Sequence, residues 1–242
     1  MRSLIVAFCL LFTGIFAQTI NTGLTYSVIA PKVITPKTPV LIVLHGYGSN
    51  ENDLLSLASS FDKKFLVFSL RAPVSAGRGG YCWFALDFLQ DKTFRYEYSA
   101  AVSSGDAIMS FVSNACKSYK ADSTQVFVLG FSQGAMMSYD LAFRYSQKIK
   151  GVVALSGLLM PQTEARPTTD KLKRCRFFIA HGTQDNVITY MNGGSAAAFI
   201  KKKGAAVEFK SYSTAHSIND QEVADVNRWL ISATTILKKA AK

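Results

Sequence analysis

The chain has 242 residues, a length that favours one large domain or two small ones. Hydrophobic residues make up 49% of it and charged residues 18%, a balance that predicts a globular protein and excludes disordered and collagen-like chains. Lysine and arginine number 27 against 16 acidic residues, and the resulting net charge of +11 raises the question of a nucleic-acid or anionic partner.

The N-terminus has the pattern of an export signal. Arg2 is followed by an apolar run from Leu4 to Phe16 and by the small residue Ala17. This pattern predicts a secretory signal peptide over residues 1–17, with an uncleaved anchor as the alternative. The run is shorter than the ~20 apolar residues of a membrane span, so we expect no stable membrane insertion. The mature chain, residues 18–242, is expected to be periplasmic or secreted and to form a single domain.

Short apolar runs typical of strands alternate along the chain with amphipathic stretches typical of helices. We expect strands at 25–30, 39–44, 65–70, 125–129, 151–155, 176–180 and 206–212, and helices at 52–61, 93–119, 133–147, 189–203 and 220–239. Residues 72–90 and 156–171 are expected to be loops. The alternation predicts an α/β fold with a mainly parallel central sheet and helices on both faces. In such a sheet, ligands bind at the carboxyl ends of the strands.

The segment Gly130-Phe131-Ser132-Gln133-Gly134 follows one of these predicted strands and opens a predicted helix. It matches the G-x-S-x-G nucleophile elbow, in which a strained turn exposes the serine and small residues must flank it. The position predicts Ser132 as a nucleophile. A tight turn with an incidental serine is the alternative.

A serine nucleophile needs a base, and the chain contains only three histidines. His45 and His181 each precede a glycine at a strand end, where a role in shaping the loop is the simpler interpretation. His216 follows the last predicted strand, which is where the base lies in the chain order Ser, acid, His of the α/β-hydrolase fold. We therefore predict His216 as the general base, against the alternative of a surface-loop residue.

The carboxylate that orients the base should lie between Ser132 and His216 on a loop after a strand. Only Asp185, five residues beyond the predicted strand 176–180, has this placement. It would hold the imidazole in one tautomer and stabilise the imidazolium. The other acidic residues considered lie within predicted helices, strands or the long loop: Asp140, Glu164, Asp170 and Glu208.

An oxyanion hole needs two backbone N–H groups near the nucleophile. One is expected from Gln133, directly after Ser132, and the other from Tyr47 in the glycine-rich turn Leu44-His-Gly-Tyr-Gly48. Glycines on both sides of Tyr47 permit a close approach of backbone to substrate. A strand-to-helix turn without catalytic role is the alternative.

Together these motifs resemble the phospholipase/carboxylesterase family of α/β-hydrolases, which includes bacterial carboxylesterases and acyl-protein thioesterases. The resemblance covers roughly residues 22–237 and rests on the motifs already quoted and on further segments: Arg71-Ala-Pro73, Trp83-Phe84, Leu155-Ser-Gly157, His181-Gly-Thr-Gln-Asp185 and His216-Ser217. It implies a compact esterase with little or no lid, a triad of Ser132, Asp185 and His216, and no metal or cofactor. It also places Trp83 beside the site and the Ser156–Pro161 loop along the acyl groove.

Three features depart from the family pattern. Ala215 replaces the glycine usual before the histidine, and Ala85 stands where many members carry aspartate. These two changes concern loop geometry and the shape of the acyl pocket. The predicted signal peptide is the third departure, and it argues against lipidated cytosolic proteins as substrates.

The apolar side chains of Leu158, Leu159 and Met160, with the aromatic residues of the Tyr81–Phe88 loop, suggest an acyl pocket, although core packing is an equal interpretation for each. We therefore predict a serine carboxylesterase for short-to-medium acyl esters of small molecules, with Trp83, Leu158 and Met160 near the substrate. An acetyl or feruloyl polysaccharide esterase, a lysophospholipase or thioesterase, and a silent binding module are the alternatives. The elbow of dienelactone hydrolases carries cysteine instead of Ser132.

The remaining charged and sulfur-containing residues predict no additional partner. The positive charge is concentrated after residue 140, in runs such as Lys201-Lys202-Lys203 that are typical of solvated helix ends, so no nucleic acid is expected. Outside the signal, Cys82, Cys116 and Cys175 form neither a disulfide framework nor a zinc motif, and free buried thiols are favoured over a single pair.

Overall fold

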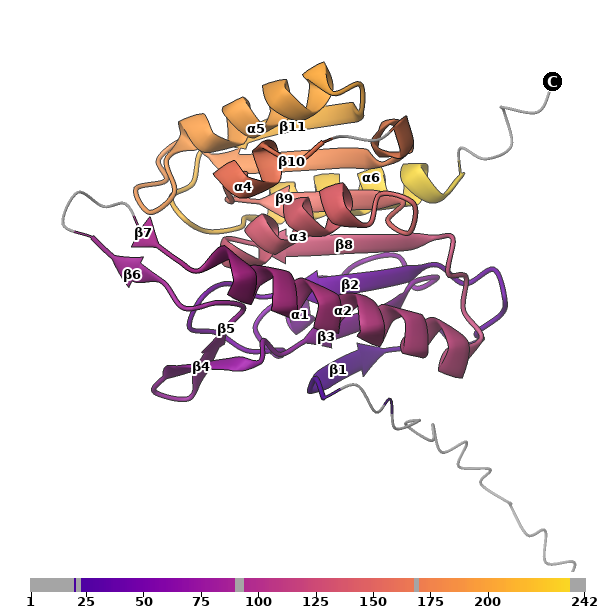
Figure 1. The fold of residues 1–242 in the computed structure, drawn as a ribbon. Coiled ribbons are helices and arrows are strands. Elements are labelled where there is room, and N and C mark those ends of the chain that lie inside the picture. The colour runs from indigo at the N-terminus through magenta and orange to yellow at the C-terminus, as the bar shows by residue number, and fades with distance from the viewer. Residues whose placement is uncertain (1–19, 21–22, 90–93, 168–169, 236–242) are drawn as a thin grey trace, which may run out of the picture.

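The computed structural model describes residues 20, 23–89, 94–167 and 170–235. These residues form one central sheet with helices packed against it (Figure 1). Seven strands lie in the order β1-β3-β2-β8-β9-β10-β11. The edge strand β1 runs antiparallel to β3, and the other neighbours run parallel. The strands are β1 (Tyr26–Ile29), β2 (Val40–Leu44), β3 (Leu66–Leu70), β8 (Val126–Phe131), β9 (Gly151–Leu155), β10 (Arg176–Gly182) and β11 (Ala206–Tyr212).

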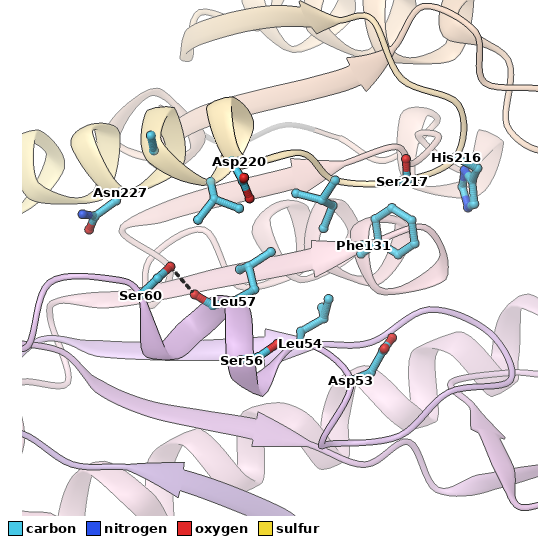
Figure 2. A pocket seen from close by; sticks show the side chains of 13 residues that line it. Asp53, Leu54, Ser56, Leu57, Ser60, Phe131, His216, Ser217, Asp220 and Asn227 are labelled. Atoms are coloured by element: carbon cyan, nitrogen blue, oxygen red, sulfur yellow. Dashed lines mark hydrogen bonds between the residues drawn. The ribbon is translucent and has the colours of Figure 1, made fainter.

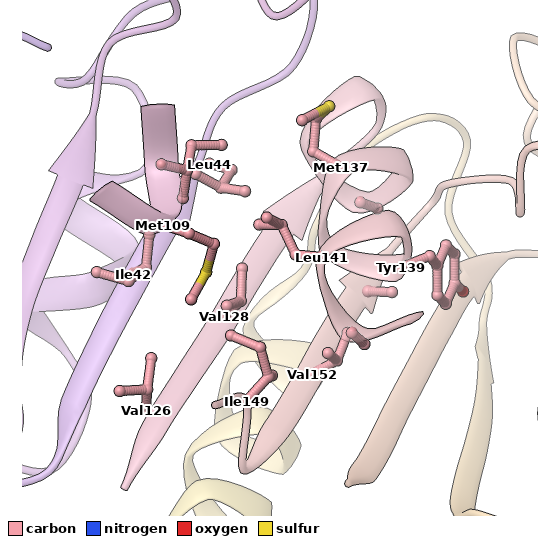
Figure 3. Close-up of a cluster of buried hydrophobic side chains, with 14 of the residues drawn as sticks. Ile42, Leu44, Met109, Val126, Val128, Met137, Tyr139, Leu141, Ile149 and Val152 are labelled. Atoms are coloured by element: carbon pink, nitrogen blue, oxygen red, sulfur yellow. The ribbon is translucent and has the colours of Figure 1, made fainter. Parts of the chain in front are cut away.

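Helices cover both faces of the sheet, which confirms the predicted α/β architecture. Successive residues of a strand point to opposite faces, so Ile42 of β2 belongs to one apolar cluster and Leu41 and Val43 to the other. The first cluster, part of which is drawn in Figure 3, packs beneath α2 (Tyr98–Tyr119), α3 (Gln133–Arg144) and α5 (Tyr190–Lys202). The second packs beneath α1 (Leu55–Ser59) and α6 (Asp220–Thr235).

The chain changes direction across the sheet between β2 and β8. From β2 it proceeds to β3 on one side, and from β8 it proceeds through β9 and β10 to β11 on the other. This topological switch point is where open α/β sheets form their ligand crevices. The loops that leave the carboxyl ends of β2 and β8 therefore lie side by side at the expected position for a site.

Residues 72–89, after β3, contain more regular secondary structure than the predicted loop. They include the hairpin of β4 (Val74–Gly77) and β5 (Gly80–Cys82), and β6 (Asp87–Phe88) pairs with β7 (Phe94–Arg95). The prediction of a helix from residue 93 was wrong, because residues 94–95 pair with 87–88 and the backbone at Glu97 is extended, so that α2 begins at Tyr98. The helix predicted at 52–61 is shortened to α1.

The loop between β9 and β10 carries the short helices α4 (Pro161–Glu164) and η1 (Asp170–Arg174). Cys82, Cys116 and Cys175 are buried free thiols, as expected. Within the described ranges, the helices lack the combination of length and apolar character needed to cross a membrane. The predicted signal peptide, residues 1–17, and the predicted helix end at 236–239 lie outside the described residues.

Candidate active site

Ser132 lies in a strained turn at the end of β8, as the elbow motif predicts. Its backbone has φ 55° and ψ −116°, a conformation that non-glycine residues rarely adopt and that costs on the order of 1–3 kcal/mol. A Cβ atom on Gly130 would lie 2.1 Å from the carbonyl oxygen of Gly134, and one on Gly134 would lie 2.0 Å from that of Leu44. The two glycines are therefore required for the turn to pack against β2 and α3.

His216 and Asp185 meet at the same edge of the sheet. Asp185 follows β10 and His216 follows β11, and the two strands run parallel, so their carboxyl ends are adjacent. Nδ1 of His216 lies 2.7 Å from Oδ2 of Asp185. The other carboxylate oxygen, Oδ1, accepts hydrogen bonds from the backbone N–H groups of Val187 and Ile188 at 2.9 and 3.0 Å. The Asp185 side chain is therefore held on both sides in a buried position.

This hydrogen bond determines the tautomer of His216. Because a carboxylate only accepts, Nδ1 must carry the proton, and the unprotonated Nε2 is then available as a base. The ring of Phe131 packs against the imidazole at 4.9 Å between centroids and restricts its rotation.

A pocket of about 180 Å³ brings the predicted residues together. Ser132, His216, Gln133 and Tyr47 all line it. Its remaining walls are apolar: Leu86, Phe94, Met136, Val187 and Ile188. The arrangement places a hydroxyl, an imidazole and two backbone segments around one small apolar cavity.

His45 and His181 have the loop-shaping positions expected of them. Nε2 of His45 accepts a hydrogen bond from Ala72 N–H at 3.0 Å, so the protonated Nδ1 donates to Gly46 O at 2.7 Å. Nε2 of His181 donates to Ile188 O at 2.7 Å. Burial lowers the pKa of both imidazoles, which keeps them neutral at pH 7.

The turn that carries Tyr47 lies directly against Ser132 and is braced from behind. A Cβ atom on Gly46 would lie 3.4 Å from Cβ of Ser132. Gly48 N–H donates to Tyr81 O at 2.8 Å, and Tyr81 N–H donates to Ser49 O at the same distance, so the turn is joined to β5. The short chain Gly46–Ser49 thus runs between the elbow and the β4–β5 hairpin.

An ion pair between the buried Glu51 and the partly exposed Arg71 supports the same turn. Glu51 accepts hydrogen bonds from Arg71 Nε at 2.6 Å and from Arg71 Nη2 at 2.5 Å, and the guanidinium stacks 4.7 Å from the Tyr81 ring centroid. The Arg71 hydrogen bonds lower the pKa of Glu51. Sequence reasoning missed Glu51, although the Arg71-Ala-Pro73 motif marks its partner, because two charges twenty residues apart show no local pairing signal.

The side chain of Gln133 connects the elbow to the loop after β5. Its Oε1 accepts from Trp83 N–H at 2.9 Å and its Nε2 donates to Phe84 O at 2.7 Å, while the Trp83 indole N–H donates to His45 O at 2.9 Å. Trp83 is fully buried, so its place beside the site is that of a support. This role of the Gln133 side chain was not predicted.

The residues predicted for the acyl pocket in the loop after β9 lie in different surroundings. Leu158 lines a second pocket of about 530 Å³ that shares Phe94, Val187 and Ile188 with the first. Met160 is fully buried in the main apolar cluster and packs behind the site. Val187, which is 53% exposed and lines both pockets, was not predicted, because an isolated valine in a loop carries no sequence signal.

Comparison with known proteins identifies the family. Residues 25–233 match the model for phospholipase/carboxylesterase proteins. The chain belongs to this family. It is 30% identical over 108 residues to the carboxylesterase SOBER1 of Arabidopsis thaliana, an alignment that covers 43% of this chain and 47% of that protein, about half its length. It is 28% identical over 154 residues to acyl-protein thioesterase 1 of Candida albicans, covering 61% of this chain and 67% of that protein.

The similarity extends to the three-dimensional structure. The crystal structure of the Bacillus cereus carboxylesterase superimposes with a TM-score of 0.77 at 26% sequence identity, covering 88% of this chain and 96% of the other. The predicted α/β-hydrolase fold and the predicted family are thus confirmed.

Proposed function

We propose that the chain is a serine carboxylesterase that hydrolyses short-to-medium acyl esters through an acyl-enzyme intermediate. The observation that carries the proposal is the 2.7 Å hydrogen bond between His216 Nδ1 and Asp185 Oδ2 beside a pocket that Ser132 and His216 both line. Membership of the phospholipase/carboxylesterase family supports the same reaction class.

In the proposed mechanism, Nε2 of His216 takes the proton of Ser132 as Oγ attacks the ester carbonyl. The backbone N–H groups of Tyr47 and Gln133 would stabilise the oxyanion, each by about 3 kcal/mol. His216 then gives the proton to the leaving alcohol as its C–O bond breaks. Water, activated by the same imidazole, releases the acid from Ser132. Asp185 keeps the reactive tautomer of His216 throughout.

The size of the apolar pocket supports a short acyl group. A volume of about 180 Å³ lies below the 300–1,000 Å³ typical of sites for larger ligands. The second pocket continues from Phe94, Val187 and Ile188 and would accommodate a longer chain. We expect kcat/KM to be highest for p-nitrophenyl esters of short-to-medium acyl groups and to fall for long ones, and a maximum at long chains would contradict this assignment.

The decisive test replaces Ser132 with alanine. S132A should lower kcat for p-nitrophenyl butyrate by at least ~10⁴-fold and abolish labelling by a fluorophosphonate, because no other hydroxyl lies at the elbow. S103A, which alters an exposed serine on α2, serves as the matched control and should retain both activities. Normal turnover by S132A, with circular dichroism unchanged, would overturn the proposal, and an unlabelled wild-type protein would favour a binding module.

We also propose that the protein is exported, on the basis of the pattern in residues 1–17. N-terminal sequencing of the protein recovered outside the cytoplasm should begin at Gln18. A chain that begins at Met1 would contradict cleavage.

A further inference from the structure

A groove of about 820 Å³ leads from His216 along the face of the sheet that α1 and α6 cover (Figure 2). His216 and Phe131 stand at one end, and Ser60 and Asn227 lie at the other. This groove is separate from the acyl pocket, whose Leu86, Phe94 and Met136 walls it does not share. His216 lines both cavities, so the imidazole is the point at which they meet.

The position of the His216 imidazole indicates which part of an ester substrate would lie in the groove. In the proposed reaction, which this inference assumes, His216 delivers a proton to the oxygen of the leaving alcohol as the C–O bond breaks. The alcohol must therefore lie against the imidazole, while the acyl group occupies the small pocket. The groove is the space beyond that oxygen.

The charge of the groove is opposite to that of the protein. Its thirteen lining residues include two carboxylates, Asp53 and Asp220, and no lysine or arginine, although the chain as a whole carries +11. Figure 2 shows Asp53 on the side of α1 and Asp220 on the side of α6. Neither belongs to an ion pair within the described part of the chain. Asp220 lies in the first turn of α6, where the helix dipole offsets part of its charge, so Asp53 should contribute more.

The floor of the groove is apolar. Leu54, Leu57 and Val223 line it. Figure 2 shows Leu54 and Leu57 on the side of α1 and the ring of Phe131 next to His216. Methyl or methylene groups next to a positive charge would contact this floor, and an aromatic ring attracts such a cation. An anionic group would find no lysine or arginine among the lining residues to neutralise its charge and would be repelled by the two carboxylates.

We propose that this groove binds the alcohol portion of the ester and selects alcohols that carry a substituted ammonium group. The two carboxylates neutralise the charge and the apolar floor contacts its alkyl substituents. A neutral alcohol of the same shape gains only the apolar contacts, and a phosphorylated or sulfonated alcohol is repelled.

The test compares two esters that differ in one charge. Butyrylcholine and 3,3-dimethylbutyl butyrate have the same acyl group and alcohols of nearly the same shape, so the ratio of their kcat/KM values isolates the charge. We expect the wild-type protein to favour butyrylcholine about fivefold to tenfold at low ionic strength, because each exposed carboxylate near a cation contributes roughly a twofold to fivefold effect. Raising the salt to 0.5 M should reduce the ratio, since exposed charges are screened.

Substitution of Asp53 and Asp220 tests whether these two carboxylates cause the preference for the charged ester. D53N should lower the ratio, and D53N combined with D220N should bring it to about one. D170N removes an exposed carboxylate outside the groove, paired with Lys173, and should leave the ratio at the wild-type value. The single variant D53N keeps the test valid if the change at the α6 terminus impairs folding.

The outcomes separate this inference from the esterase proposal. If neither ester is hydrolysed in a manner that depends on Ser132, the esterase proposal fails. If both are hydrolysed but the neutral ester is equal or better, or if the preference survives the double substitution, the groove does not select cationic alcohols.

Discussion

The replacement of Asp185 by asparagine tests the proposed mechanism at its most specific point. Asparagine has nearly the same shape, so its Oδ1 can still accept from the N–H groups of Val187 and Ile188. Its amide nitrogen, however, would replace Oδ2 and present N–H donors to Nδ1 of His216. To form a hydrogen bond, the imidazole must then carry its proton on Nε2, the tautomer that cannot accept the proton of Ser132.

The magnitude follows from this change of tautomer. Loss of the reactive tautomer in a serine–histidine–aspartate site lowers kcat by about 10⁴-fold, equivalent to about 5 kcal/mol in the barrier. The effect on folding should be much smaller, about 1–2 kcal/mol, because the loop keeps its backbone hydrogen bonds and loses only the charge. D185N should therefore remain folded at 25 °C while losing nearly all turnover of p-nitrophenyl butyrate.

The assay combines steady-state kinetics with thermal unfolding of the same samples. D122N provides the matched control and should keep the wild-type kcat, because Asp122 lies just before the start of β8, whereas Asp185 follows the end of β10. A D185N protein whose kcat stays within tenfold of wild type would refute the assignment of Asp185 as the orienting carboxylate. Loss of activity accompanied by general unfolding would refute the hydrogen-bond reasoning for the 185–188 turn.

Two further predictions concern buried carboxyl groups away from Ser132. Burial raises the pKa of Glu222 to about 8, and neither of its carboxylate oxygens has a hydrogen-bond partner among the described residues. The folded protein therefore retains a proton that the unfolded chain loses near pH 4.5, so stability falls as pH rises from about 4.5 to 8. E222Q should remove this loss of stability. In denaturant unfolding, the free energy of unfolding of E222Q should exceed that of the wild type by up to about 4 kcal/mol at pH 8 and differ little at pH 5. An equal difference at both pH values would contradict the raised pKa of Glu222. E51Q should keep one of the two hydrogen bonds from Arg71 and replace the other with a contact between two donors, because the glutamine amide nitrogen cannot accept. We expect this change to lower the free energy of unfolding by about 1 kcal/mol, since Arg71 is partly exposed, and to lower kcat for p-nitrophenyl butyrate severalfold through displacement of the Tyr47 turn. An unchanged kcat in the folded variant would show that the turn needs no such support.

The parts of the fold that were predicted correctly carry their signal in adjacent residues. The β-branched run 39–44 and the run 151–155 are buried on both faces, and the sequence of each differs sharply from its flanks. The elbow is equally local, because Gly130 and Gly134 are required by contacts within one strand–turn–helix unit and its neighbour β2. The start of α2 was misplaced because it is decided by pairing between 87–88 and 94–95, a contact across a loop that leaves no periodic pattern.

For the site, local motifs predicted Ser132 as the nucleophile and placed one histidine and one aspartate at suitable strand ends. That His216 Nδ1 and Asp185 Oδ2 lie 2.7 Å apart follows from the parallel pairing of β10 with β11, which no local sequence pattern specifies. The Glu51–Arg71 pair and the groove between α1 and α6 likewise depend on how distant segments pack. Strand ends and strained turns are specified by residues adjacent in the chain, whereas cavities and their charge depend on elements that are distant in the sequence and pack together in the fold.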